Sequence, residues 1–374
     1  MSRKYGKKVE IKINPLAYNI GLIGESGIGK STTIKEFCEK LVGDDGYIML
    51  DIGKEDGHKA INGIVSAEIP DWDTFSDFVD DVIENKATDY KNLKVIGLDT
   101  YDQLVEIAEP EVVRMHNRAN PDKRVDSINA AFGGFGKGMD KVSEIILDKL
   151  WELKKVGVSF IMIGHVKNKE IDDAATGESY SILTTNMSQK YFNAIKTKLD
   201  FLGVAYVDRK IVKEKTGKKN IATKQDIVKS KVAEESRRIS FRDDNYSIDS
   251  KSRFADIVDN IPMDSDALIK AINDAIMAEH SKGEKTVDES KKEEAKEAKN
   301  KEKEVEKYIE NRKATKVDEV VNAKLISEIQ DKFSVQSKEV KNSIKIVMAD
   351  NGFSSFRDED IPTQALKKIV SMLK

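Results

Sequence analysis

The chain has 374 residues, of which 39% are hydrophobic and 34% are charged, and its formal net charge is −3. This length exceeds the needs of one ordinary core, so we expect two domains or a core with appendages. The slightly acidic balance argues against a globally basic nucleic-acid binder, although it does not exclude local basic patches. Cys38 is the only cysteine, which excludes a disulfide within the chain and fits a reducing compartment.

The sequence offers no segment for export or for crossing a membrane. The N-terminal stretch MSRKYGKKVEIKI lacks the apolar centre of a signal peptide, and no run approaches the roughly 18 apolar residues of a membrane span. The four histidines and the single cysteine are too scattered for a structural zinc site. We therefore expect a soluble cytoplasmic protein with no membrane partner.

Four apolar runs predict buried strands, and each is followed by a polar break and a helical periodicity. They cover residues 18–23, 47–52, 93–99 and 158–166. Continuous apolar runs between helices are typical of parallel strands that are covered on both faces. Helices are expected over 73–85 and 138–155, with the apolar residues of the second on one stripe. The alternation predicts an α/β fold with a mainly parallel, doubly wound sheet.

After the fourth strand the pattern changes. Residues 201–212 and 237–242 predict strands that close the sheet, partly in antiparallel orientation, and residues 265–278 predict a helix. Strand alternation places the basic side chains of Arg238 and Arg242 on one face. These elements complete a core domain over residues 1–280.

Residues 281–315 are almost wholly charged, with alternating signs, and cannot bury enough surface to fold alone. We interpret them as a linker that is either a solvated helix or disordered, in preference to a functional element. Residues 316–374 regain helical periodicity, with a helix stop at Asn351-Gly352 and a final helix over 363–373. This small helical module fits partner binding or self-association as well as it fits simple packing.

The strongest motif follows the first predicted strand. The stretch from Gly24 to Ser31 matches G-x-x-x-x-G-K-[ST], and it has the required strand before it and helix after it. Glycines let the loop curl so that backbone N–H groups converge on phosphate oxygens, and the following helix adds its positive N-terminal end. Lys30 is expected at the β- and γ-phosphates and the Ser31 hydroxyl on Mg²⁺. The sequence thus predicts ATP and Mg²⁺, with nucleotide contacts from Gly24, Glu25, Ser26, Gly27, Ile28, Gly29, Lys30, Ser31 and Thr32.

Three further residues are candidates for the chemistry of this site. Asp99 ends the third predicted strand, where its carboxylate can hold Mg²⁺ through water opposite Ser31. Hydrolysis also needs a group that orients water. Because no Glu directly follows Asp99, we favour Glu55, after the second strand, for this role. The alternative is that Glu55 is only a solvated acid in a loop. His165, at the end of the fourth strand, is expected beside the motif strand, as a γ-phosphate sensor or as a structural histidine.

These features together resemble a known group of proteins. The same order of motifs includes the Asp-Thr strand end, a long helix, Gly164-His165-Val166-Lys167, Ser252-Arg253-Phe254, the stretch 71–75 and the stretch 185–206. Over roughly residues 15–260 the chain resembles phage-encoded, RecA-like, AAA-type ATPases of the Sak group of single-strand annealing proteins. The linker and the C-terminal module lie outside this resemblance.

The resemblance implies a RecA-like P-loop NTPase core that binds ATP and Mg²⁺, forms homo-oligomers and handles single-stranded DNA during annealing or recombination. It assigns nucleotide and metal roles to Gly24, Gly29, Lys30, Ser31 and Asp99, and the sensor role to His165. Glu55 lies four residues after Asp51, a wider spacing than in RecA itself. A cognate single-strand-binding protein is a further partner that the resemblance suggests, and a phage-encoded chain would act in the host bacterial cytoplasm.

RecA-like cores hold DNA with the segments after the third and fourth strands, so we examined both for cations and aromatic residues. Cations supply phosphate contacts, and phenylalanines among glycines can stack on bases. Both segments also carry acids and fit ordinary exposed loops. The candidates are Arg114, Arg118, Lys123, Arg124, Phe132, Phe135 and Lys137 in the first segment, and Lys167 and Lys169 in the second.

In such oligomers a neighbouring copy can insert a cation at the γ-phosphate. The candidates in the closing β region are Arg237, Arg242 and Arg253, each of which also fits an ordinary surface charge. Three functions stay open: a DNA-stimulated ATPase of recombination, a weakly hydrolysing nucleotide switch that loads or binds a partner, and a small-molecule P-loop kinase. The kinase is disfavoured because no Arg-rich lid insertion is evident.

Overall fold

The computed structural model describes residues 9–54, 57–172, 177, 179–219, 226–242, 249–315, 319–333, 336–356, 358 and 361–373. The chain forms two compact units, Met1–Lys296 and Glu297–Lys374. The first unit contains the central sheet and the second is helical. The strands are β1 Ile20–Gly24, β2 Tyr47–Ile52, β3 Ser66–Ile69, β4 Val95–Asp99, β5 Ser159–Asp172, β6 Ser179–Thr185, β7 Phe201–Lys219, β8 Asp226–Ser240, β9 Lys251–Ser252 and β10 Asn260–Pro262.

The centre of the sheet is parallel, as the continuous apolar runs predict. The strand order is β10-β8-β7-β1-β5-β4-β2-β3, and all neighbours from β7 to β3 run parallel. Every residue of β1 and β4 is buried, which explains why these strands show no polar alternation. β5 separates β1 from β4. The carboxyl ends of β1, β2, β4 and β5 therefore meet at one edge, which we call the carboxyl edge.

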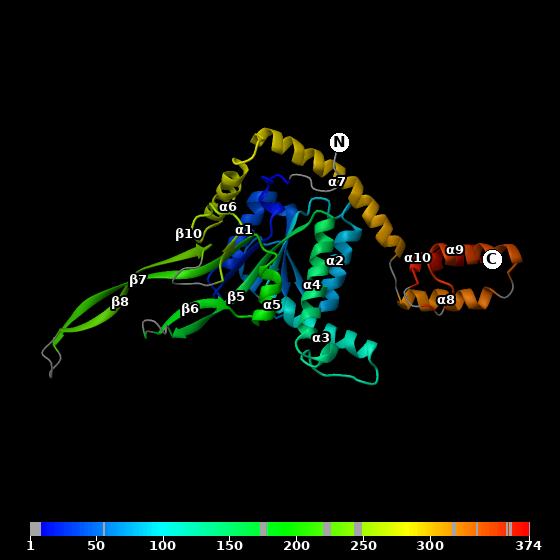
Figure 1. Ribbon diagram of the computed structural model, residues 1–374, viewed down its shortest axis with the longest axis horizontal. Coiled ribbons are helices and arrows are strands. Elements are labelled where there is room, and N and C mark those ends of the chain that lie inside the picture. Colours follow the sequence, from blue (N-terminus) through cyan, green and yellow to red (C-terminus); the bar gives the residue numbers. More distant parts are fainter. Residues whose placement is uncertain are drawn as a thin grey trace. The chain divides into compact units, whose positions relative to one another are not determined.

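Helices cover both faces of this sheet (Figure 1). One face packs against α1 and α6, and their apolar residues share a core with β1, β2 and β5. The helices α2, α3 and α4 contact one another and cover the other face. This arrangement confirms the α/β prediction. The helices of this unit are α1 Lys30–Val42, α2 Trp72–Glu84, α3 Tyr101–Ala119, α4 Lys137–Lys155, α5 Gln189–Lys196 and α6 Ser265–His280.

Two strands are longer than the sequence pattern predicts, because each continues beyond the sheet into a hairpin arm (Figure 1). β5 extends to Asp172, and its outer part pairs antiparallel with β6 from Val166↔Thr185 to Asp172↔Ser179. β7 pairs antiparallel with β8 from Val204↔Ser240 outwards, which confirms the expected antiparallel closure of the sheet. Both arms begin as buried core strands and become polar further out.

The charged segment predicted as a linker is helical in the structure. Within the predicted segment 281–315, α7 spans Val287–Thr315. Its start is capped because the Thr286 hydroxyl accepts from the Glu289 N–H, while the Glu289 carboxylate accepts from the Thr286 N–H at 2.9 Å. The compact units divide at residue 296, inside α7.

The C-terminal unit contains its own small core. Its helices are α8 Glu319–Phe333, α9 Lys338–Asp350 and α10 Thr363–Met372. Ile329, Ile344, Leu366 and Ile369 are fully buried at its centre, at the helical spacing that the sequence shows. The side chain of Asn322 ties α8 to the segment before α10 by donating to the Ile361 carbonyl at 2.7 Å.

Candidate nucleotide-binding site

The loop after β1 has the backbone that its motif predicts. Gly27 and Gly29 have φ angles of 74° and 112°, a region that favours glycine because it lacks a Cβ. Gly24 is constrained by space instead, since a Cβ there would lie 2.8 Å from the Cβ of Ala205 in β7. The three motif glycines therefore have two different structural causes, backbone conformation at two positions and close packing of strands at the third.

The helix α1 begins at Lys30, immediately after this loop. No side chain caps its N-terminus, so the first N–H groups and the helix dipole favour an anion there. Ser31 is partly exposed and Thr32 is exposed in the first turn. The hydroxyl of Ser31 thus lies at the end of the helix where phosphate groups of a nucleotide would bind.

Lys30 is held against the loop itself. Its side chain is buried, and Nζ donates to the carbonyls of Gly24 at 3.0 Å and Glu25 at 2.9 Å. These two bonds fix the ammonium among the backbone groups that cradle phosphates in this motif. We expect Nζ to exchange the two carbonyls for phosphate oxygens when a nucleotide binds.

Asp99 ends β4 at the carboxyl edge and is buried beside a second acid. The strand register pairs Asp99 with Asp51 at the end of β2. Between them lies His58, with Nε2 2.9 Å from Oδ2 of Asp99 and Nδ1 3.9 Å from Oδ2 of Asp51. The next residue, Thr100, is also buried, and its hydroxyl makes no hydrogen bond with a described residue. The carboxyl edge thus contains several buried oxygen atoms that are able to bind a metal ion.

These donors fit Mg²⁺ bound together with a nucleotide. Mg²⁺ prefers oxygen ligands and is usually held by one or two protein groups, waters and substrate phosphates. Ser31 would supply a hydroxyl from α1, and Asp99 would supply a carboxylate from β4. The Thr100 hydroxyl is a buried polar group that a ligand or its water can satisfy. When bound, the ion would neutralise charge on the terminal phosphates.

His165 lies where the sequence places it, beside the motif strand. The register of β1 and β5 pairs it with Gly24. Its Nδ1 lies 2.6 Å from Oδ2 of Asp102, and its backbone N–H donates to Oδ1 of the same carboxylate at 3.3 Å. Asp102 lies in the first turn of α3. His165 therefore joins the end of the motif's neighbouring strand to the helix that follows Asp99.

Three residues at this edge were not predicted. His58 has no motif signal and lies in a short 3₁₀ helix, Gly57–Ala60. Asp102 could have been noticed as an acid three residues after Asp99 in a helix start. Gln103 accepts from the Lys54 N–H at 3.4 Å, which links α3 to the segment after β2. Glu55, the predicted water-orienting acid, lies outside the described residues.

A pocket of about 360 Å³ lies beside the loop and α1. This volume lies within the range of small-molecule sites, and Gly29 and Thr32 of the motif border it. Arg237 of β8 borders it, and Nη1 of that residue donates to the Ile28 carbonyl at 2.9 Å. Its remaining walls come from the loop, α1, the β10–α6 connection and the start of α6, namely Ile28, Thr33, Glu36, Lys40, Met263, Asp264, Ser265 and Asp266.

The other two arginines suggested for insertion into a neighbouring copy also contact their own chain. Arg242 pairs with Asp259 at 3.1 Å. Arg253 pairs with Asp200 at 3.3 Å and donates to the Thr197 carbonyl at 2.8 Å. Arg237, Arg242 and Arg253 thus all have acceptors within one chain, and their role towards a neighbour stays a prediction.

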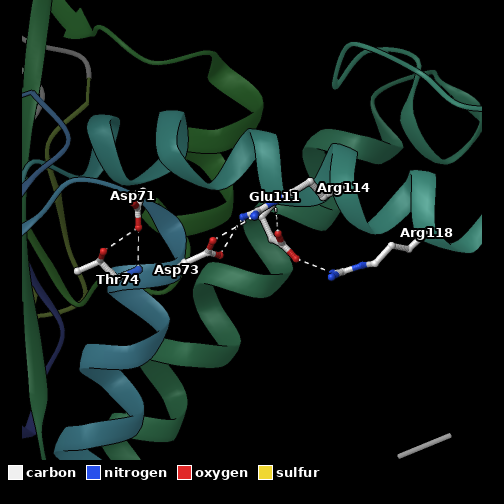
Figure 2. Close-up of polar contacts among 6 residues, drawn as sticks. All are labelled: Asp71, Asp73, Thr74, Glu111, Arg114 and Arg118. Atoms are coloured by element: carbon white, nitrogen blue, oxygen red, sulfur yellow. Dashed lines mark hydrogen bonds and ion pairs between the residues drawn. The ribbon is translucent and has the colours of Figure 1, made fainter. Parts of the chain in front are cut away.

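The first predicted DNA segment divides into two parts. Figure 2 shows Arg114 donating to both carboxylate oxygens of Asp73, at 2.8 and 3.0 Å, while its Nε pairs with Glu111 at 2.8 Å. Arg118 pairs with the other oxygen of Glu111 at 2.8 Å. The hydrogen bonds that Arg114 donates to Asp73 raise the pKa of Arg114. Because each cation here has an acid beside it, this stretch of α3 is not strongly positive.

In the glycine-rich part of this segment, the two phenylalanines differ in their surroundings. Phe132 packs edge-on against His116, with centroids 5.2 Å apart, and its N–H donates to Nδ1 of that ring. Phe135 is 101% exposed and has a φ of 53° among glycines with positive φ. Lys137 opens α4. Lys123 and Arg124 before this turn are exposed, as are Lys167 and Lys169 on the β5 arm.

The fold and the loop geometry define a P-loop NTPase core with a mainly parallel sheet. A family profile described as an AAA domain matches residues 16–254, and the chain belongs to this family of ATPase domains. A search among curated proteins found no match. Among solved structures, the chain is similar to the flagellar accessory protein FlaH from Methanocaldococcus jannaschii, with 11% identity, a TM-score of 0.30 and coverage of 65% of this chain and 83% of that one.

No helix in the part of the chain that the structure describes is both long enough and apolar enough to span a membrane.

Proposed function

We propose that the chain is an ATP-hydrolysing protein that binds single-stranded DNA and acts in annealing or homologous recombination. The observation that carries the DNA part is Phe135, a fully exposed aromatic side chain in a glycine-rich turn. An exposed aromatic ring offers a face on which a base of a single strand can stack. The resemblance to phage single-strand annealing ATPases supports the same assignment.

The two candidate DNA segments lie at the same end of the core (Figure 1). A short helix between them, α5, connects them: Lys190 donates to the Gly136 carbonyl at 2.7 Å and pairs with Asp140 at 2.9 Å. α5 follows the β5–β6 arm in sequence, whereas Gly136 caps α4 next to Phe135. In this proposal a single DNA strand that stacks on Phe135 continues onto Lys167 and Lys169.

These segments also begin at the nucleotide site. α3 starts directly after Asp99 and Thr100, and β5 carries His165 at the carboxyl edge. The Asp102–His165 hydrogen bond joins these two elements at their origin. This connection supports a DNA affinity that depends on the nucleotide, because a change at the phosphate end would reach both segments through rigid elements.

The test is ATP turnover and binding to a fluorescent oligodeoxythymidine, measured on the full chain and on Lys30→Ala and Phe135→Ala. We expect DNA to stimulate turnover, Lys30→Ala to abolish turnover, and Phe135→Ala to weaken DNA binding by about 5- to 150-fold, since one stacked base contributes about 1–3 kcal/mol. Nucleotide affinity should be unchanged in Phe135→Ala. Ile346→Ala is the matched control, because Ile346 is 59% exposed on α9, outside both segments.

The main alternative is a weakly hydrolysing switch that loads or binds a protein partner. The ion pairs of Arg114 and Arg118 with acids favour it, because they reduce the positive charge of the first segment. DNA binding that ignores the nucleotide would support this alternative. Phosphoryl transfer to a small acceptor without DNA would contradict both and support a kinase.

A further inference from the structure

The carboxyl edge contains a buried histidine that no part of the P-loop chemistry requires. His58 is 5% exposed and lies between the two strand-end acids, Asp51 at 8% and Asp99 at 6%. It comes from the turn Gly57–Ala60, whereas the acids end β2 and β4. Three separate segments of the chain thus meet with their polar ends in one buried cluster.

The register explains why a nitrogen donor is useful there. Asp51 and Asp99 are paired residues of adjacent parallel strands, whose backbones lie about 4.8 Å apart. Two carboxylates buried at neighbouring strand ends repel each other, and each needs hydrogen-bond partners in place of water. An imidazole N–H that donates to one of them offsets part of this cost and fixes that carboxylate in one rotamer.

The contact is specific to one oxygen of Asp99. Nε2 of His58 lies 2.9 Å from Oδ2, a normal hydrogen-bond length, so this contact fixes the orientation of the carboxylate. In that orientation the carboxylate would hold a bound Mg²⁺ through water. Hydrogen-bonded partners of metal-holding carboxylates typically change metal affinity by about 10- to 100-fold when they are removed.

We propose that His58 is a positioning residue that orients the Asp99 carboxylate and thereby sets the affinity of the nucleotide site for Mg²⁺. The proposal rests on the ATP and Mg²⁺ part of the proposed function and is independent of DNA. A purely structural role would instead stabilise the fold equally with and without Mg²⁺. The two roles therefore differ in one measurable property, the dependence of nucleotide binding on Mg²⁺.

The experiment titrates a fluorescent ATP analogue into the full chain, in EDTA and over a range of Mg²⁺ concentrations. For His58→Ala we expect Mg²⁺ affinity of the nucleotide complex to fall about 10- to 100-fold, while affinity for the analogue in EDTA stays unchanged. His58→Gln keeps an N–H donor near the position of Nε2 and should recover most of the loss. In an Asp99→Ala background, His58→Ala should cause no further loss, because the two residues act through one contact.

His280→Ala is the matched control. His280 is 7% exposed on α6 and pairs with Ser290 at 2.7 Å through Nε2, so its loss also removes one buried imidazole hydrogen bond. Unchanged Mg²⁺ affinity in His58→Ala would overturn the proposal, as would an equal loss in EDTA or an equal effect of His280→Ala. If the unaltered chain binds no analogue in any condition, this result contradicts the proposed ATP function itself. Such a failure is therefore distinguishable from a failure of the His58 proposal.

Discussion

Cys38 provides a direct test of nucleotide binding that does not depend on turnover. It is the only cysteine of the chain, it lies in α1 and it is 0% exposed. Burial also raises the pKa of its thiol well above the ordinary range, so the reactive thiolate is disfavoured as well as shielded. An alkylating reagent can therefore reach Cys38 only when the core around α1 opens.

The expected decrease in the labelling rate of Cys38 follows from the position of α1. Its N-terminus carries Lys30 and Ser31, and its buried face packs Ile34, Phe37 and Cys38 into the main core. A ligand at that N-terminus binds the closed state and not the open one. At a concentration of about 100 times its dissociation constant, it stabilises the closed state by about 2.7 kcal/mol. The labelling rate of Cys38 should therefore fall about 100-fold when opening is fast compared with alkylation.

The assay follows alkylation of the full chain by mass, with and without saturating MgATP, over a low range of urea. In Lys30→Ala, where the ammonium is lost, we expect little or no protection by MgATP. The urea dependence shows which kind of opening exposes Cys38. If the free energy of opening falls with urea as steeply as the free energy of equilibrium unfolding, the opening is global unfolding. Equal labelling rates with and without MgATP, at that slope, would refute nucleotide binding at α1.

Three further predictions concern stability and domain organisation. Above about pH 8.5 the unfolded chain loses the proton of the Cys38 thiol, whereas the folded chain keeps it. The free energy of unfolding should therefore fall by up to about 1.4 kcal/mol per pH unit above that pH. In urea unfolding, Cys38→Ala should show a smaller fall over the same pH range. Lys86→Met should destabilise the core by about 2–4 kcal/mol, because Nζ of Lys86 donates to the Tyr90, Lys91 and Leu93 carbonyls at 2.7, 3.1 and 2.9 Å; Lys91→Met, at an exposed position, is the control and should change stability by less than about 0.5 kcal/mol. A chain that ends at Lys296 should bind MgATP as the full chain does, because the two units have separate cores, and a weaker affinity in a titration would contradict this separation.

Hydrophobic patterning was sufficient to predict the parallel centre of the sheet. The strands β1 and β4 themselves contain no exposed residue, so their sequences do not show the polar alternation of a half-exposed strand. The P-loop was predictable for a different reason, because its glycines are required by φ angles and by the Gly24–Ala205 contact. Local sequence therefore determines the apolar strands and the φ angles of Gly27 and Gly29, whereas the glycine at position 24 depends on the tertiary contact with β7.

The neighbours of Asp99 were not predictable in the same way. His58 reaches Asp99 from 41 residues away in sequence, through a turn whose conformation no pattern specifies. The two phenylalanines also have similar local sequences, each next to Gly, yet Phe132 packs on His116 and Phe135 is exposed. The difference depends on a histidine of the preceding helix, which only the folded chain brings into contact.

The charge of the candidate DNA surface limits how strongly DNA binding should depend on salt. Of the cations predicted to contact phosphates, Arg114 and Arg118 are ion-paired to acids, whereas Lys123, Arg124, Lys137, Lys167 and Lys169 form no ion pair with a described residue. Each phosphate contact on a single strand contributes about −0.7 to the slope of log affinity against log salt, so these five cations predict a slope near −3.5 and all seven a slope near −4.9. Recruiting the two arginines requires breaking their pairs with Asp73 and Glu111, a cost that phosphate contacts would have to offset. A slope closer to −3.5 is therefore expected, and removing Asp73 together with Glu111 should make the slope steeper, because Arg114 and Arg118 then lose their acidic partners.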